Sequence, residues 1–160
     1  MSLRPVDEVV DQLLGLVKPT GKSELRTIDK AVNCCAAKDI QSPINVPPAD
    51  NSAMDGYAIA YADANLQTSY RVSARIPAGY VGSRLASGTV ARIFTGAEIP
   101  VGADTVVMQE NTELVGDEVK LLSLPGQFEN VRSKGQDIEA GSLIIRKGDL
   151  LSARTLSLVA

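Results

Sequence analysis

The spacing of apolar residues changes along this chain, and the change indicates one amphipathic helix followed by short strands. Near the amino terminus, apolar residues recur with the period of a helix that has one buried face, at Val6, Val9, Val10, Leu13, Leu14 and Val17. From residue 70 the period is two, and turn residues separate the apolar runs about every ten positions. We therefore expect a mainly β fold with flanking helices.

The helix and strand boundaries follow from turn and capping signals. A helix is expected over 5–18, because Pro5 suits a first helical position and Pro19 stops the helix. A shorter helical stripe runs from Ile28 to Cys35, and Ser152 is a good N-cap for a helix over 153–159. The expected strands cover 23–27, 38–41, 70–76, 90–94, 105–108, 119–124, 130–133 and 143–146.

Composition excludes several classes of function. The net charge is −3 and the Lys and Arg residues are dispersed, so no basic surface for nucleic acid is expected. The sequence has no run of about 18 apolar residues, so no membrane span is expected. The absence of histidine removes His-based triads and the commonest zinc sites. Adjacent Cys34 and Cys35 are expected to be reduced and buried, as in a cytoplasmic protein.

The densest polar segment is 50–57, which reads Asp-Asn-Ser-Ala-Met-Asp-Gly-Tyr. The prolines at 43–48 make its entry extended, and an apolar stretch follows it. Carboxylates such as Asp50 and Asp55 hold Mg²⁺ or act as general bases, whereas Asp and Asn also form simple turns on their own backbone. Spacing alone leaves both interpretations open.

A second candidate is the turn at Phe94-Thr95-Gly96-Ala97, where a strand ends. Its hydroxyl and backbone amides form either an anion-binding concavity or an ordinary tight turn. Glu110, at the end of another strand, has a surface acid as its default interpretation.

The third candidate is the segment 130–137, where Arg132 and Lys134 stand at alternate positions before Asp137. Arg binds phosphate oxygens through a bidentate fork and Lys binds them as a point charge. A solvated basic turn explains the same pattern equally well. No nucleotide-binding glycine motif of the Walker or dinucleotide type is present.

The string Pro-Pro-Ala-Asp-Asn-Ser-Ala-Met-Asp-Gly-Tyr-Ala at 47–58 resembles the signature of the MoeA and gephyrin E-domain family of molybdopterin molybdenumtransferases. The Thr-Gly-Ala turn at 95–97, the run at 103–110 and the Arg-x-x-Gly-x-Asp-Ile stretch at 132–138 follow in the family's order. The departures are Ala49 in place of an aromatic residue, one Arg fewer and Gln136 in place of Glu, and Asn33-Cys34 where the family commonly has Gly-Arg.

The resemblance implies a mostly β amino-terminal region with irregular bifurcated and coiled sheets. Three parts are expected: a helix at 1–18 that packs on a missing body or a partner subunit, a discontinuous inner subdomain of 19–42 and 139–160, and an outer β-rich arm of 43–138. The family's later Thr-Gly-Asp-Glu and Gly-Gly-x-Ser motifs are absent from this chain. The chain is therefore expected to be a fragment that is inactive by itself.

The resemblance also implies a transferase of molybdenum cofactor biosynthesis. Such an enzyme inserts molybdate into adenylylated molybdopterin and releases AMP, with Mg²⁺ or another divalent cation. It acts as a cytoplasmic homodimer, and molybdopterin adenylyltransferase is a further expected partner. The alternative is a dimerisation or protein-docking scaffold module without a catalytic role.

Motif matching assigns roles to individual residues in this sequence. The implied catalytic residues are Asp55, Thr95 and Asp137, with Asp55 also at the metal. The implied substrate-binding residues are Asn51, Ser52, Arg132 and Lys134.

Overall fold

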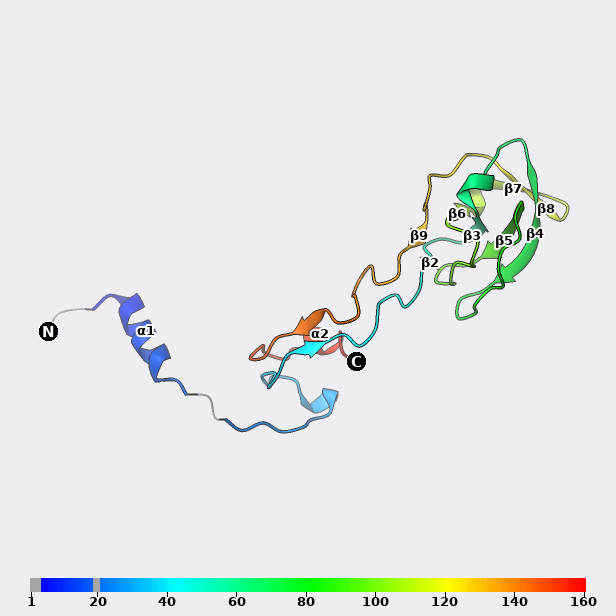
Figure 1. The fold of residues 1–160 in the computed structure, drawn as a ribbon. Helices are drawn as coiled ribbons and strands as arrows, with labels where there is room; N and C mark the ends of the chain where they lie inside the picture. Colours follow the sequence, from blue (N-terminus) through cyan, green and yellow to red (C-terminus); the bar gives the residue numbers. More distant parts are fainter. Residues whose placement is uncertain (1–3, 19–20) are drawn as a thin grey trace. The chain divides into compact units, whose positions relative to one another are not determined.

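The structure is a computed structural model that describes residues 4–18 and 21–160. The chain forms two compact units, one of Met1–Lys38 with Arg146–Ala160 and the other of Asp39–Ile145. The second unit contains all the strands of the described chain (Figure 1). The expected boundary between residues 18 and 19 and the end of the expected helix at Pro19 reach residues outside the described ranges. The three-part division therefore stays a prediction.

The first unit contains the helix expected near the amino terminus. It is α1, Val6–Leu16, preceded by Pro5 at the N-cap and carrying Asp7 and Glu8 in its first turn. Negative side chains are favourable there because the helix dipole is positive at its amino end. None of its residues is buried, and its apolar face is exposed. The helix is confirmed, and no described residue buries its apolar face.

The rest of the first unit is irregular. The strand expected over 23–27 is wrong, because these residues form no ladder and all are exposed. The second helical stripe contains only the 3-10 turn η1, Ile28–Lys30. The final helix, α2, is Ala153–Leu156, shorter than expected but capped by Ser152 in a reciprocal capping box with Thr155.

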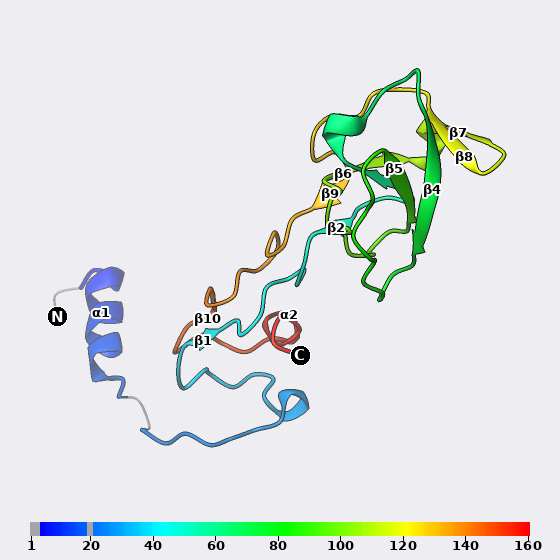
Figure 2. The same cartoon turned by 45° about the vertical axis from the view of Figure 1, so that its right-hand side comes forward.

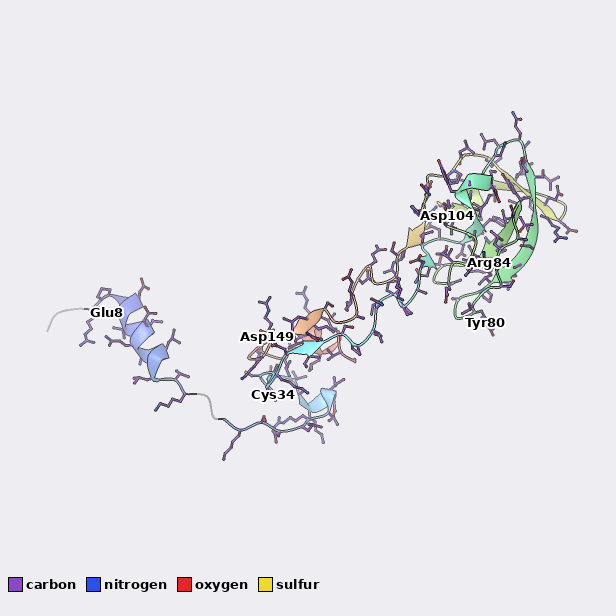
Figure 3. The ribbon with its side chains drawn as sticks, viewed as in Figure 1. Glu8, Cys34, Tyr80, Arg84, Asp104 and Asp149 are labelled. Carbon is purple, nitrogen blue, oxygen red and sulfur yellow. The ribbon has the colours of Figure 1, made fainter. Side chains whose placement is uncertain are left out.

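Backbone hydrogen bonds between 33–36 and 148–151 hold this unit together, including an isolated bridge between Cys35 and Leu150. Cys34 lies among these bonds, and Figure 3 labels it beside Asp149, whose carbonyl accepts from Ala36 N. Both cysteines are free. Their expected burial is wrong, because Cys34 is half-buried and Cys35 is exposed at the edge of this small ladder.

The second unit is built on one curled six-stranded sheet with the order β6-β3-β5-β4-β8-β7. All neighbours are antiparallel except β4 and β5, which are parallel. Figure 2 shows the long β4 along one side of the sheet and the β7–β8 hairpin beyond it. The strands are β3 Gly56–Ile59, β4 Ser69–Ile76, β5 Thr89–Ile93, β6 Thr105–Met108, β7 Thr112–Val115 and β8 Glu118–Leu121.

The sheet has an apolar cluster on each face, because side chains alternate between faces along a strand. Ala58 belongs to one cluster and the next residue, Ile59, belongs to the other. Val106 and Val107 divide in the same way. The core therefore uses Val, Ile, Leu and Ala almost alone, with Tyr70 as its one fully buried aromatic side chain among the described residues.

Two further ladders of two strands each extend from the sheet. β1, Ile40–Gln41, pairs with β10, Leu143–Ile145, and β2, Asn51–Ser52, pairs with β9, Val131–Arg132. Between them an isolated bridge joins Val46 to Ile138, so the two segments run side by side (Figure 1). The mainly β fold with flanking helices and irregular sheets is confirmed. No described helix has the length and apolar character that a membrane span requires.

Candidate functional site

Asp55 and Thr95 are brought together by strand pairing. β3 and β5 are antiparallel, with Gly56 opposite Ile93, so the start of β3 lies beside the end of β5. Asp55 precedes this pair and Thr95 follows it by two residues. One carboxylate oxygen, Oδ1 of Asp55, accepts hydrogen bonds from the backbone N and the Oγ1 of Thr95, each 2.8 Å long. Two residues forty positions apart therefore form one unit.

β3 and β6 approach each other so closely at position 56 that only glycine fits there. A Cβ on Gly56 would lie 2.0 Å from the carbonyl oxygen of Val107, which belongs to the rigid ladder of β6. No side chain fits that space. The glycine that follows Asp55 therefore lets three strands meet where the acid is held.

The environment of Asp55 favours its charged form. The hydrogen bonds from Thr95, and after them the positive charge of Arg92, hold the pKa of the Asp55 carboxyl below its ordinary value of 3.8. Partial burial opposes this shift but does not cancel it. The second oxygen, Oδ2, has no hydrogen-bond partner in the part of the chain that the structure describes. Asp55 is thus an ionised acid with one oxygen open to a ligand.

Arg92 lies close enough to Asp55 to act on its charge, and it was not identified as a site residue from the sequence. Its Nη1 donates to the carbonyl of Gly56 at 3.0 Å, and its Nη2 donates to Oε1 of Gln109 at 2.6 Å. The guanidinium also stacks on the rings of Phe94 and Tyr57, at 4.6 and 5.3 Å from their centroids. The signal that identifies it is the alternation of β5, which places Arg92 on the opposite face from its neighbours Ala91 and Ile93.

The turn at 94–97 does not form the anion-binding concavity that its sequence left open. Thr95 N donates to Asp55, Gly96 N donates to Ser52 O, and Ala97 N donates to Phe94 O. All three amides therefore have acceptors, and that interpretation is wrong. The turn, with Gly96 at a φ of 81°, instead holds the acid and β2 in place.

Ser52 lies at the centre of this arrangement. Its side chain is buried, its hydroxyl donates to Met54 O at 2.6 Å, and its own N donates to Ala97 O at 2.9 Å. On its other side it pairs with Val131 of β9. Ser52 thus joins three distant segments, and its expected contact with substrate stays a prediction.

The third candidate segment forms a separate cluster. Arg132 Nη2 lies 2.5 Å from Oδ2 of Asp137, and both side chains are roughly half exposed. Lys134 N donates to Oδ1 of Asp50 at 2.7 Å, across 84 positions of sequence. Asp50 is therefore not a turn residue bonded to its own neighbours, which was one of the two interpretations of its sequence.

Asn51 is the connection between the two groups. It stands opposite Arg132 in the β2–β9 ladder and forms a bridge with Glu98 just beyond the Thr95 turn. Its Oδ1 is buried and has no hydrogen-bond partner among the described atoms. Within the described ranges, no hydrogen bond or ion pair joins Asp55 directly to Arg132 or Asp137.

The arrangement fits a divalent cation only when a ligand helps to hold it. Within residues 4–18 and 21–160, no group of three or more His, Cys, Asp and Glu side chains is placed to hold a metal. Asp55 supplies one free carboxylate oxygen. Mg²⁺ commonly keeps several waters and binds through one or two carboxylates plus substrate phosphates. One carboxylate is thus sufficient beside a phosphate ligand.

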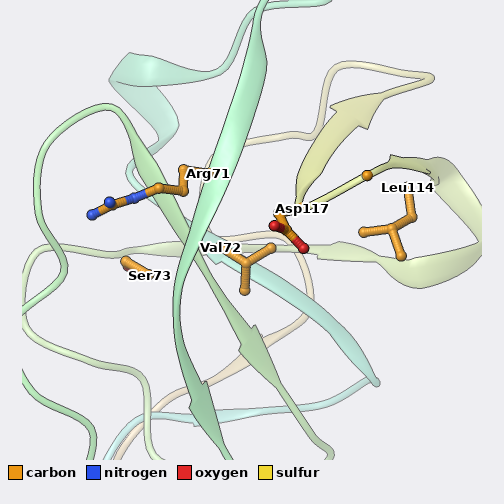
Figure 4. Close-up of a pocket in the computed structure, with 6 residues that line it drawn as sticks. Arg71, Val72, Ser73, Leu114 and Asp117 are labelled. Carbon is orange, nitrogen blue, oxygen red and sulfur yellow. The ribbon is translucent and has the colours of Figure 1, made fainter.

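A shallow hollow of about 560 Å³ lies elsewhere on the sheet, between β4 and the β7–β8 turn (Figure 4). It contains none of the residues expected at a site. Its lining is Arg71, Val72, Ser73, Leu114, Gly116 and Asp117. The candidate site is an open surface on the Asp39–Ile145 unit rather than this hollow.

Comparison with known proteins agrees with the segments described above. The profile of the family described as MoeA N-terminal region (domain I and II) matches residues 4–160. The chain belongs to this family. The resemblance carried by the Asp-Asn-Ser-Ala-Met-Asp-Gly string is therefore confirmed.

Relatives with established names resemble the chain over nearly all its length. It is 35% identical to the molybdopterin molybdenumtransferase of Haemophilus influenzae over 157 residues, which are 97% of this chain and 39% of that protein. It is 36% identical to the protein of the same name from Nostoc over 165 residues, 99% of this chain and 38% of the relative. This member of the family thus spans about two fifths of the length of these relatives.

Solved structures with a similar fold belong to the same family. Two crystal structures of the molybdopterin biosynthesis MoeA protein from Pyrococcus horikoshii match 99% of this chain and 42% and 43% of theirs. Their TM-scores are 0.80 and 0.88, at 32% and 30% sequence identity. The irregular combination of a curled sheet and two small ladders is therefore the family's fold.

Proposed function

We propose that this chain is the amino-terminal part of a molybdopterin molybdenumtransferase and supplies Asp55 to the site where molybdate enters adenylylated molybdopterin. The observation that carries the proposal is the Asp55–Thr95 pair, with its lowered carboxyl pKa and its free Oδ2. The family and the names of the relatives support the substrate class.

The reaction needs a negative group that holds a cation between anionic ligands. Asp55 is ionised at neutral pH, as its ordinary pKa of 3.8 already requires, and the two hydrogen bonds from Thr95 lower that pKa further. Its Oδ2 would bind Mg²⁺ or another divalent cation, and that ion would screen the phosphates and the molybdate from one another. Hydrolysis of the adenylyl group, with release of AMP, would accompany the insertion of molybdate.

The second cluster would bind the oxyanions. Lys134 is exposed and carries a positive charge, and Arg132 is held by Asp137 in a half-exposed ion pair. An incoming oxyanion would compete with Asp137 for the guanidinium, whose fork matches phosphate and molybdate oxygens. Until an oxyanion binds, Asp137 would hold Arg132 in position. Asn51 and Ser52 would hold the Asp55–Thr95 pair and the Arg132–Asp137 pair at a fixed distance from each other.

In this proposal the chain is inactive alone and acts within a longer cytoplasmic protein that forms a homodimer. The other lining of the site would come from the pterin-binding part of the partner subunit. Molybdopterin adenylyltransferase would supply the adenylylated substrate.

One observation favours a second candidate function, a dimerisation or docking module without a catalytic role. The apolar face of α1, from Val6 to Val17, is exposed in the described chain. An exposed stripe of this kind usually covers a surface of another protein or domain.

The test is Asp55→Asn in the full-length protein, assayed for molybdate insertion and for oligomeric state. Asn keeps an acceptor for Thr95 and loses the charge, so we expect insertion to fall about a hundredfold or more while the dimer persists. Asp117→Asn, in the exposed β7–β8 turn, is the matched control and should leave insertion unchanged. Full activity of Asp55→Asn would refute the catalytic proposal and leave the docking module as the better account.

A further inference from the structure

Two arginines share one aromatic ring beside the Asp55–Thr95 pair. In the parallel pairing of β4 with β5, Arg75 stands directly opposite Arg92. The guanidinium carbon of each lies 4.6 Å from the centroid of the Phe94 ring. Phe94 immediately precedes Thr95, and the charge of Arg92 acts on Asp55. Arg75 thus belongs to the same locality, although no sequence motif includes it.

The two arginines differ in what holds them. Arg92 is half-buried and donates to Gly56 O and to Gln109 Oε1, which fixes its position. Arg75 is exposed, and its guanidinium contacts the ring but forms no hydrogen bond or ion pair within the described chain. The ring orients the Arg75 guanidinium but satisfies none of its five N–H donors.

Neither arginine forms an ion pair with a carboxylate among the described residues. Like charges directly opposite one another on neighbouring strands are destabilising. Asp55 is the acid whose charge Arg92 affects, but its Oδ1 accepts from Thr95 and it forms no hydrogen bond with either arginine in the described chain. Glu110 is engaged by Gln109 Nε2 at 3.1 Å. A bound anion would relieve the repulsion and satisfy the free donors of Arg75.

We propose that Arg75, supported by Phe94 and Arg92, binds a phosphate group of the substrate beside the Asp55–Thr95 pair. The inference rests on the proposed function for the identity of the ligand, which is the phosphate anhydride of a nucleotidyl substrate. The planar fork of arginine suits two phosphate oxygens. The ring is already stacked on guanidinium groups, so it serves to orient Arg75 rather than to stack on a base.

The site is tested by itself by measuring the binding of inorganic pyrophosphate to this chain in a metal-free buffer that contains a chelator. Titration by NMR should shift the resonances of Arg75, Phe94 and Thr95, and higher salt should weaken the binding. Arg75→Gln should weaken it about tenfold, as expected for the loss of one charge-assisted contact at an exposed position.

The matched control is Arg71→Gln. Arg71 is exposed on the same strand, but the bulge between Val72 and Ala74 places it on the other face, and no ring contact holds it in the described chain. Arg71→Gln removes the same charge as Arg75→Gln. If it weakens pyrophosphate binding equally, only the net charge matters and the inference is overturned. Absence of any pyrophosphate binding to the unaltered chain would overturn it as well.

A kinetic measurement separates this inference from the function on which it rests. In the full-length protein, Arg75→Gln should raise KM for adenylylated molybdopterin about tenfold with little change in kcat, because the contact holds a non-reacting group. If the protein inserts no molybdate but pyrophosphate still needs Arg75, the proposed function fails and the site stands. If insertion is normal and neither KM nor pyrophosphate binding responds to Arg75→Gln, only the site fails.

Discussion

Asp55 and Asp137 are both acids of the candidate site, but they are held in opposite ways. Asp55 is bound by neutral donors, the amide and the hydroxyl of Thr95, with Arg92 nearby but not paired to it. Asp137 is bound by a cation, in a direct ion pair with Arg132. The first arrangement keeps a negative charge available to a ligand, whereas the second neutralises it.

This difference indicates what each acid is suited to do. A carboxylate stabilised by dipoles attracts a cation without first releasing one. A carboxylate in a half-exposed ion pair contributes little to stability but holds its arginine in a defined place. Asp55 is therefore the better metal ligand of the two, and Asp137 is the better positioning residue.

The largest expected effect concerns the backbone that holds Asp55 beside Thr95. Gly56→Ala places a methyl group against the carbonyl of Val107 in the middle of the sheet. We expect a loss of about 3 kcal/mol in the free energy of unfolding, because a ladder strand cannot shift cheaply. Urea denaturation measures it. Gly126→Ala, where an added Cβ meets only Oε2 of Glu129 at an ordinary 3.6 Å, is the control for the loss of a glycine. A loss no greater than that of the control would contradict the close packing.

A smaller effect is expected from Thr95→Val, which keeps the backbone N–H and removes the hydroxyl. The pKa of Asp55 should rise toward its ordinary value of 3.8, because one of the two bonds that lower it is lost. A depressed pKa stabilises the fold above the ordinary value, and this contribution is lost as pH falls through the folded pKa. The variant should therefore lose less stability on acidification than the unaltered chain.

Carbon-detected NMR titration of the Asp55 carboxyl measures this pKa directly. Thr89→Val is the matched control, because the Thr89 hydroxyl contacts Ala86 O and Ser73 rather than a carboxylate. An unchanged Asp55 titration in Thr95→Val would mean that the Thr95 hydroxyl does not hold the acid.

The smallest expected effect is at the second acid. A double-mutant cycle of Arg132→Gln and Asp137→Asn should give a coupling of about 0.2–1 kcal/mol that declines with salt, because both side chains are about half exposed. Stability by denaturation gives the coupling. A coupling several times larger would mean that the pair is a structural element, and the contrast with Asp55 would then disappear.

The elements that could be predicted were those with a clear hydrophobic period. The stripe from Val6 to Val17 indicated α1, and alternation indicated β4 and β5. The strand expected over 23–27 failed because its residues pair with nothing, and β7, Thr112–Val115, was missed because its residues are mostly exposed. Short or exposed strands depend on a partner strand rather than on their own pattern.

The site was predictable to the extent that its residues form contiguous motifs. Asp55, Thr95, Arg132 and Asp137 were identified from such strings, and the structure pairs the first two and the last two. Arg75 and Arg92 lie in alternating strands, where the pattern indicates which face each occupies but not that strand pairing places them on one aromatic ring.

The sequence by itself determined the type of fold, the family and the residue types available for chemistry, because these depend on local periodicity and on contiguous strings. Only the tertiary structure decided which oxygen of Asp55 is free, which arginine has unsatisfied donors and which amides are already used. Those properties depend on strand register, which brings residues forty or more positions apart within hydrogen-bonding distance. No local pattern contains that information.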